Sequence, residues 1–171
     1  MLDALPLEGN PFAALTAVAG PAILTNACSV LSLGTANRLA RVVDRTRVVT
    51  ATINALEDTS AEYPLWMEQL ERLNVRAHLL LKALQNFYAA LGLFAAAALI
   101  AIIGSVMSYY HQQLAFQTAA IIGLGTGSLA VLGLVSGCTL MVRETRLAVQ
   151  TQEDEARVAH PRHRAAESKQ S

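Results

Sequence analysis

The stretch that decides the fold runs from residue 83 to residue 142 and reads ALQNFYAALGLFAAAALIAIIGSVMSYYHQQLAFQTAAIIGLGTGSLAVLGLVSGCTLMV. It contains no Asp, Glu, Lys or Arg. Because a helix needs roughly 20 apolar residues to cross the bilayer core, this stretch is long enough for two crossings. A polar and aromatic cluster at residues 108–113 divides it and is typical of a membrane interface. We therefore predict transmembrane helices over residues 84–108 and 114–142, joined by an extracytoplasmic turn at 109–113.

A second charge-free stretch, from Gly9 to Asn37, predicts another transmembrane helix over residues 12–34. Only 15% of the chain is charged, against about a quarter in soluble proteins. Helices of a soluble bundle would need polar faces toward water, and these stretches have none. The segment 1–11 lacks the positive charge of a signal peptide, so the first span is predicted to remain as an anchor. The fold class is thus all-α and integral to the membrane, with three transmembrane helices.

Orientation follows from the basic residues. All thirteen Lys and Arg lie in two stretches, Arg38 to Lys82 and Arg143 to Lys169. Positive residues resist translocation, so both stretches are expected in the cytoplasm. The N-terminus, which has acidic Asp3 and Glu8 but no cation, is then outside. The predicted localisation is a bacterial inner membrane, crossed several times, with the C-terminus in the cytoplasm.

Residues 35–83 are predicted to form a cytoplasmic antiparallel helical hairpin between the first and second spans. Apolar residues follow heptad spacing in two seams on either side of a break at residues 58–64. Seams of this kind pack as a coiled coil. The two seams are Leu39, Val42, Thr46, Val49, Ile53 and Leu56, and then Trp66, Leu70, Leu73, Ala77, Leu80, Leu84 and Phe87.

Cations gather on the part of this hairpin nearest the membrane. We single out Arg38, Arg41, Arg45 and Arg47 as a basic face. One interpretation is attraction to anionic lipid headgroups, worth about 1 kcal/mol per cation near the surface. The other is a surface that docks an anion or a protein partner.

Polar and small residues mark two of the spans. Thr25, Asn26, Ser29 and Ser32 form a polar stripe in the first span, which either makes hydrogen bonds between helices or lines a pore. Small residues four apart permit close helix packing in the third span: Gly123, Gly127, Gly133 and Gly137. Cys28 and Cys138 are expected to be buried thiols outside any disulfide.

No catalytic or metal-binding motif is recognisable in the chain. No ionisable residue lies deep in a span, which argues against proton-coupled transport. The formal net charge of zero offers no field for gathering nucleic acid. Residues 143–171 are predicted to be a cytoplasmic, largely disordered tail. We therefore expect no enzyme, no cofactor, no metal and no nucleic-acid partner.

Three segments resemble a bacterial membrane family catalogued as domain of unknown function 2721. They are Asn10 to Phe12, Pro21 to Leu31 and Asn37 to Arg47. The resemblance covers roughly Asn10 to Arg146 and implies a small inner-membrane protein without naming an activity, substrate or cofactor. The positions that match the family's pattern are Asn26, Asn37, Arg38, Arg41, Asp44 and Arg45.

Two functions remain open from the sequence. The first is a non-enzymatic structural or regulatory module that self-associates and docks a partner through the hairpin. The second is a homo-oligomeric channel lined by the first span. A vestibule of arginines would make such a channel selective for anions.

Overall fold

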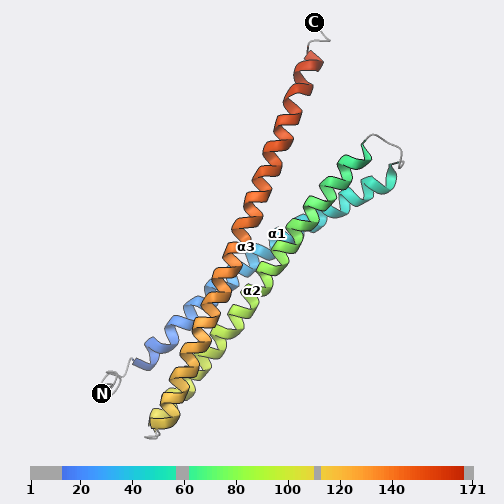
Figure 1. The fold of residues 1–171 in the computed structure, drawn as a ribbon. Coiled ribbons are helices and arrows are strands. Elements are labelled where there is room, and N and C mark those ends of the chain that lie inside the picture. The colour runs from blue at the N-terminus through green and yellow to red at the C-terminus, as the bar shows by residue number, and fades with distance from the viewer. Residues whose placement is uncertain (1–12, 57–61, 110–112, 168–171) are drawn as a thin grey trace. The chain divides into compact units, whose positions relative to one another are not determined.

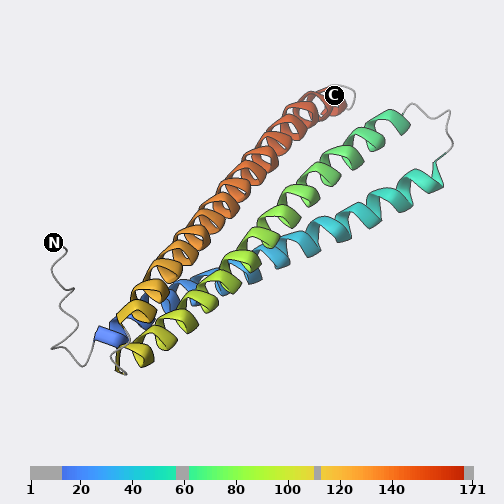
Figure 2. The same cartoon turned by 60° about the horizontal axis from the view of Figure 1, so that its bottom comes forward.

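The fold consists of three long helices in chain order: α1 (Ala13–Ala55), α2 (Tyr63–Tyr109) and α3 (Gln113–Glu167). Figures 1 and 2 show them from two directions. This computed structural model describes residues 13–56, 62–109 and 113–167, and the side chains of 19–56, 62–107, 114 and 116–149. The described residues contain no strand, which confirms the all-α class.

Among the residues with described side chains, two helices are long and apolar enough to cross a membrane: Tyr63–Met107 and Phe116–Val149. Only 22% and 6% of their most apolar windows are buried inside the protein. The core helix of a soluble protein would instead be mostly buried, so this exposure favours a membrane environment. The predicted first span, residues 12–34, extends beyond the described side chains, which begin at residue 19, and its described part is not one of these two helices.

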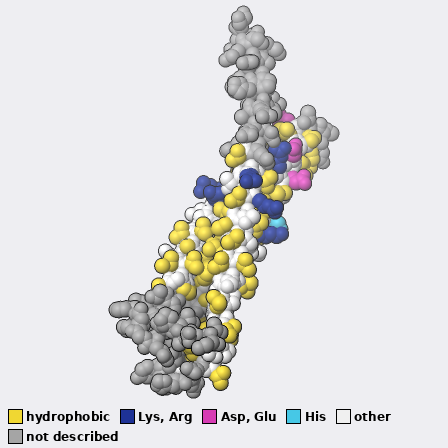
Figure 3. Space-filling view, turned by 60° about the vertical axis from the view of Figure 1, so that its left-hand side comes forward, with side chains coloured by type: hydrophobic (Ala, Val, Ile, Leu, Met, Phe, Trp, Pro, Cys, Tyr) yellow, Lys and Arg dark blue, Asp and Glu magenta, His cyan; other side chains and the backbone are white. Residues whose placement is uncertain are grey.

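The chain divides into two compact units. The apolar unit comprises Met1–Ala36 and Ala83–Gly137, and the charged unit comprises Asn37–Lys82 and Cys138–Ser171. Every Lys and Arg of the chain falls in the charged unit. Figure 3 shows Lys and Arg side chains on the visible, described part of that unit, and shows hydrophobic side chains over much of the visible apolar unit.

The centre of the apolar unit is a buried cluster in which most side chains are small. Cys28, Ala90, Phe94 and Ala130 form its buried cluster, so all three helices contribute. Next to this cluster, Phe87 is fully buried. A Cβ atom added at Gly137 would lie 2.6 Å from Cε1 of Phe87. The aromatic ring therefore occupies space that only a glycine at this position leaves open.

The core of the charged unit draws on both predicted heptad seams. Its buried cluster consists of Val42, Val49, Ile53, Leu73 and Leu80. In both views the part of α1 in this unit runs antiparallel to the first part of α2 (Figures 1 and 2). Met141 of α3 packs against the same cluster. The core is thus built from three helices, whereas the sequence predicted a pair.

α3 also differs from the predicted end of the third span. The sequence predicted a span ending at residue 142 and a largely disordered tail over 143–171, whereas the helix continues to Glu167. The continuation begins RETRLAVQTQEDEARVA, which is rich in strong helix formers. This continuation brings residues 143–149 into the charged unit as structured helix.

Candidate functional site: an arginine-lined pocket

Three of the four predicted basic residues share one face of α1. Arg38, Arg41 and Arg45 are spaced three and four residues apart, so they stand one above another along the helix. All three line the same pocket in the charged unit. Arg76 of α2 joins them there, and it is a residue that the sequence reading did not single out.

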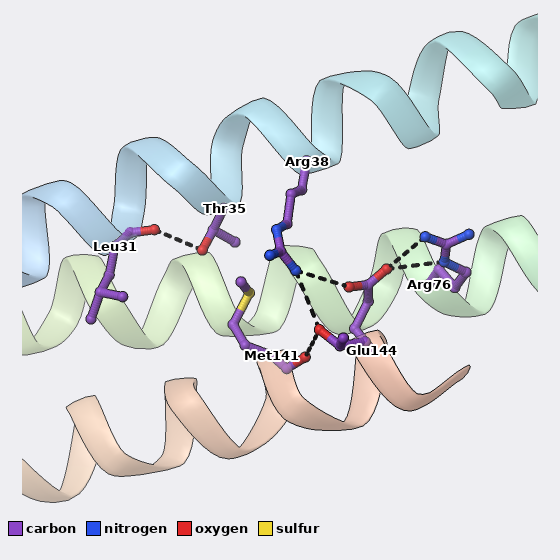
Figure 4. Close-up of polar contacts among 7 residues, drawn as sticks. Leu31, Thr35, Arg38, Arg76, Met141 and Glu144 are labelled. Carbon is purple, nitrogen blue, oxygen red and sulfur yellow. Dashed lines mark hydrogen bonds and ion pairs between the residues drawn. The ribbon is translucent and has the colours of Figure 1, made fainter. Parts of the chain in front are cut away.

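The centre of this site is Glu144 of α3, whose carboxylate is almost fully buried at 3% exposure. Nε and Nη2 of Arg76 both donate to its Oε1, at 3.0 and 2.9 Å. Nη1 of Arg38 lies 3.8 Å from its Oε2 (Figure 4). A buried carboxylate is costly unless its charge is paired and its oxygens accept hydrogen bonds. Glu144 therefore ties three helices together through two arginines.

Thr145 adds a second anchor for Arg38. Its Oγ1 accepts a hydrogen bond from Nη1 of Arg38 at 3.2 Å. The same hydroxyl donates to the carbonyl oxygen of Met141 at 3.0 Å. The Arg38 guanidinium is thus positioned by two side chains of α3 while half of its side chain stays exposed.

The pocket has a volume of about 300 Å³ and is open to the surroundings on one side. It combines four guanidinium groups with one carboxylate, alongside the apolar side chains of Val42, Leu73 and Ala148. Among the described residues, Arg41 and Arg45 have no hydrogen-bond or ion-pair partner, while the other two arginines are engaged by Glu144. The site therefore offers two cationic groups that are ready to meet an anion.

Arg47, the fourth predicted member of the basic face, lies elsewhere. It is two residues beyond Arg45, which turns it by about 200° around a helix of 3.6 residues per turn. It pairs with exposed Asp44 at 3.7 Å and lines a different hollow beside Thr46, Thr50 and Asn74. The predicted face of four arginines is thus divided between two sides of α1.

The predicted polar stripe does not share one surface either. Asn26 and Ser29 are exposed, Thr25 is half-buried and Ser32 is buried. The hydroxyl of Thr25 donates to the carbonyl oxygen of Pro21 at 2.8 Å, and that of Ser29 donates to Thr25 at 3.0 Å. The buried Oγ of Ser32 has no hydrogen-bond partner among the described residues. These four residues thus differ in exposure and do not form one uniform polar surface.

The four predicted packing glycines differ in what surrounds them. A Cβ atom at Gly133 would lie 3.5 Å from Cβ of Ala90, and one at Gly123 would lie 3.4 Å from Cγ2 of Ile100. Gly137 meets the ring of Phe87 more closely still. Nothing lies within 4 Å of the corresponding position at Gly127. In the part of the chain with described side chains, no group of His, Cys, Asp or Glu is arranged to hold a metal ion.

The sequence reading missed Arg76, Glu144 and Thr145 as site residues. A usable signal was present for Glu144, since it is an acidic residue between Arg143 and Arg146 at the very end of an apolar run. It is also three residues beyond Met141, which places both on one face of a continuing helix. Because residues 143–171 were predicted to be a largely disordered tail, no helix face containing Glu144 was predicted.

The family model described as "Protein of unknown function (DUF2721)" matches residues 18–153. The chain belongs to the DUF2721 family. This confirms the resemblance seen in the sequence, and the DUF2721 match contains every residue that lines the arginine pocket. No curated protein and no solved structure matches the chain.

Proposed function

We propose that this protein is a non-enzymatic docking module in a bacterial inner membrane, with three spans and a cytoplasmic helical hairpin. In this proposal its charged unit faces the cytoplasm and binds an anionic group of a partner in the arginine pocket. Support for the orientation comes from the confinement of all Lys and Arg to that unit, because such residues resist translocation.

The observation that carries the proposal is that two of the four pocket arginines are held by Glu144 while the other two have no partner among the described residues. Glu144 holds Arg76 by two hydrogen bonds and attracts Arg38, so these two guanidinium groups are oriented in advance. Arg41 and Arg45 line the same pocket without a partner among the described residues. Arginine presents a planar fork of donors that suits carboxylate and phosphate groups. An anion entering the pocket would therefore meet prepared donors.

Self-association is part of the same proposal. Asn26 and Ser29 are exposed on a unit whose visible surface is largely apolar. An Asn side chain facing hydrocarbon is costly, and a second copy could satisfy its amide. The alternative, an anion channel lined by α1, also needs several copies, because each chain contributes only one such helix and a pore requires a ring of them. Weighing the purified complex in detergent tests this part of both, because a strict monomer rules out the channel and contradicts self-association.

The docking proposal is tested by charge reversal with a matched control. The full-length protein in neutral detergent is titrated into a fluorescein-labelled hexaglutamate peptide, and binding is followed by fluorescence anisotropy. Arg41→Glu combined with Arg45→Glu should weaken binding at least tenfold, because two attractive charges become repulsive. Arg47→Glu, which changes charge on the other side of α1, should leave binding within about twofold. An equal loss of binding in the double variant and in Arg47→Glu would mean that the peptide responds to the general surface charge and not to the pocket.

A further inference from the structure

We propose that the anion bound in the arginine pocket is the phosphate of an anionic membrane phospholipid, held by its headgroup while its tails remain in the bilayer. This inference rests on the proposed docking function and on the proposed cytoplasmic orientation of the charged unit. It assigns the partner's chemistry, which the docking proposal leaves open between a phosphate and a carboxylate.

The first support is the depth of the pocket residues along their helices. Arg38 comes four residues after Gly34, about 6 Å along a helix, and Glu144 comes two residues after Val142, about 3 Å. Arg76 precedes the charge-free stretch by seven residues, about 10 Å, and its long side chain can reach back toward the bilayer. The headgroup layer of each leaflet is about 5–8 Å thick. The inner end of the pocket, at Arg38 and Glu144, therefore lies at the level where lipid phosphates are found. Arg41 and Arg45 come seven and eleven residues after Gly34, about 10 and 16 Å along the helix, so their guanidinium groups approach a phosphate from the side of the cytoplasm.

The second support is charge. Four guanidinium groups and one carboxylate leave a formal surplus of three positive charges around the pocket. One carboxylate partner already occupies this site, namely Glu144 of the same chain. Arg41 and Arg45 sit one turn apart and can together grip the non-bridging oxygens of a phosphodiester. Basic pockets at the cytoplasmic ends of transmembrane helices are a recognised setting for headgroup binding.

The third support is the apolar part of the wall. Val42, Leu73 and Ala148 line the pocket together with the arginines. Exposed apolar side chains continue along the same stretch of α3 at Val142, Leu147 and Val149. Free phosphate gains nothing from these surfaces, because it has no apolar part to bury. The glycerol and upper acyl carbons of a phospholipid would cover them, at about 25 cal/mol for each Å² removed from water.

The experiment uses native mass spectrometry of the full-length protein in neutral detergent. Phosphatidylglycerol or phosphatidylcholine is added at increasing concentration, and the lipid-bound fraction is measured. We expect phosphatidylglycerol to bind more tightly than phosphatidylcholine. Arg41→Leu combined with Arg45→Leu should weaken phosphatidylglycerol binding about tenfold or more, at about 1 kcal/mol per cation. Arg47→Leu is the matched control and should change it less than twofold.

A second variant protects the test against simple misfolding. Arg41→Lys with Arg45→Lys keeps both charges but removes the planar forks, so an intermediate loss is expected while the thermal stability matches the parent. Equal binding of the two lipids, or an equal loss with Arg47→Leu, would overturn the inference.

Two competition arms separate the sources of the anion. Inorganic phosphate at millimolar concentration should fail to displace bound phosphatidylglycerol, and displacement by it would mean that the pocket takes free phosphate instead. If hexaglutamate binds in a manner that depends on Arg41 and Arg45 while phosphatidylglycerol does not, the headgroup inference fails and the docking proposal stands. If neither binds, both fail together.

Discussion

At the scale of single residues, the environment of Glu144 is the feature that organises the charged unit. Its carboxylate is buried and accepts two hydrogen bonds from one guanidinium group, while that arginine is 26% exposed. The two partners therefore depend on the pair to different degrees. Arg76 can turn toward water if its partner is lost, whereas Glu144 cannot.

This asymmetry predicts different costs for removing each partner. Arg76→Leu should destabilise the protein by about 3 kcal/mol, because it leaves a buried carboxylate with only Arg38 nearby. Glu144→Leu should cost less, about 1–2 kcal/mol, because the freed guanidinium reaches solvent. The measurement is the shift of unfolding in mixed micelles with a rising fraction of SDS. A larger cost for Glu144→Leu than for Arg76→Leu would contradict this account of the pair.

The pocket also shows which site residues could be predicted from the sequence. Arg38, Arg41 and Arg45 were predicted as one face because their spacing matches a helix, and they line one pocket. Arg47 was grouped with them because it is close in sequence, and helical geometry places it on another side. Arg76 comes from the other arm of the predicted hairpin, and the basic face was defined on the first arm alone.

At the scale of elements, the buried residues of α1 recur at helical spacing within each unit. They are Cys28, Ser32, Thr35, Val42, Val49 and Ile53, separated by three, four or seven residues. The predicted polar stripe crosses this pattern, which explains why Ser32 is buried while Asn26 and Ser29 are exposed. The polar residues of α1 did not identify its inward face, because small polar side chains occur on both its buried and its exposed sides.

The contact between α2 and α3 in the apolar unit makes a prediction about glycine. Gly137→Ala should destabilise the protein by about 1–3 kcal/mol, because the new methyl group would overlap the ring of buried Phe87. Gly127→Ala is the control, since nothing lies within 4 Å of the added atom and alanine favours a helix by up to about 1 kcal/mol. SDS unfolding should move these two variants in opposite directions. Similar shifts for both variants would mean that the close approach of Gly137 to the Phe87 ring does not contribute to stability.

At the scale of the whole molecule, the proposed topology can be tested by labelling. An impermeant maleimide is added to intact cells that express single added cysteines at Asp3→Cys or at exposed Ala51→Cys. We expect the first to react at once and the second only after the cells are permeabilised, since the charged unit is proposed to be cytoplasmic. The unmodified protein, with its native Cys28 and Cys138, supplies the background. Labelling of Ala51→Cys in intact cells would reverse the orientation and remove the basis of the headgroup inference.

The sequence by itself determined the all-α class, the two strongly apolar helices and the family, because these depend on local composition and on spacing within one helix. Charge-free runs and heptad seams are properties of a continuous segment, and they remain visible without any knowledge of the partner segments. Val42, Val49 and Ile53 of the first seam lie in one buried cluster with Leu73 and Leu80 of the second.

Only the tertiary structure decided which cations share a pocket and which carboxylate they surround. Arg38, Arg76 and Glu144 come from three helices and are widely separated along the chain. Their meeting depends on the continuation of α3 beyond residue 142 and on its packing against the other two helices. Burial then requires the charge of Glu144 to be paired, which is a long-range condition that no single helix of the sequence displays.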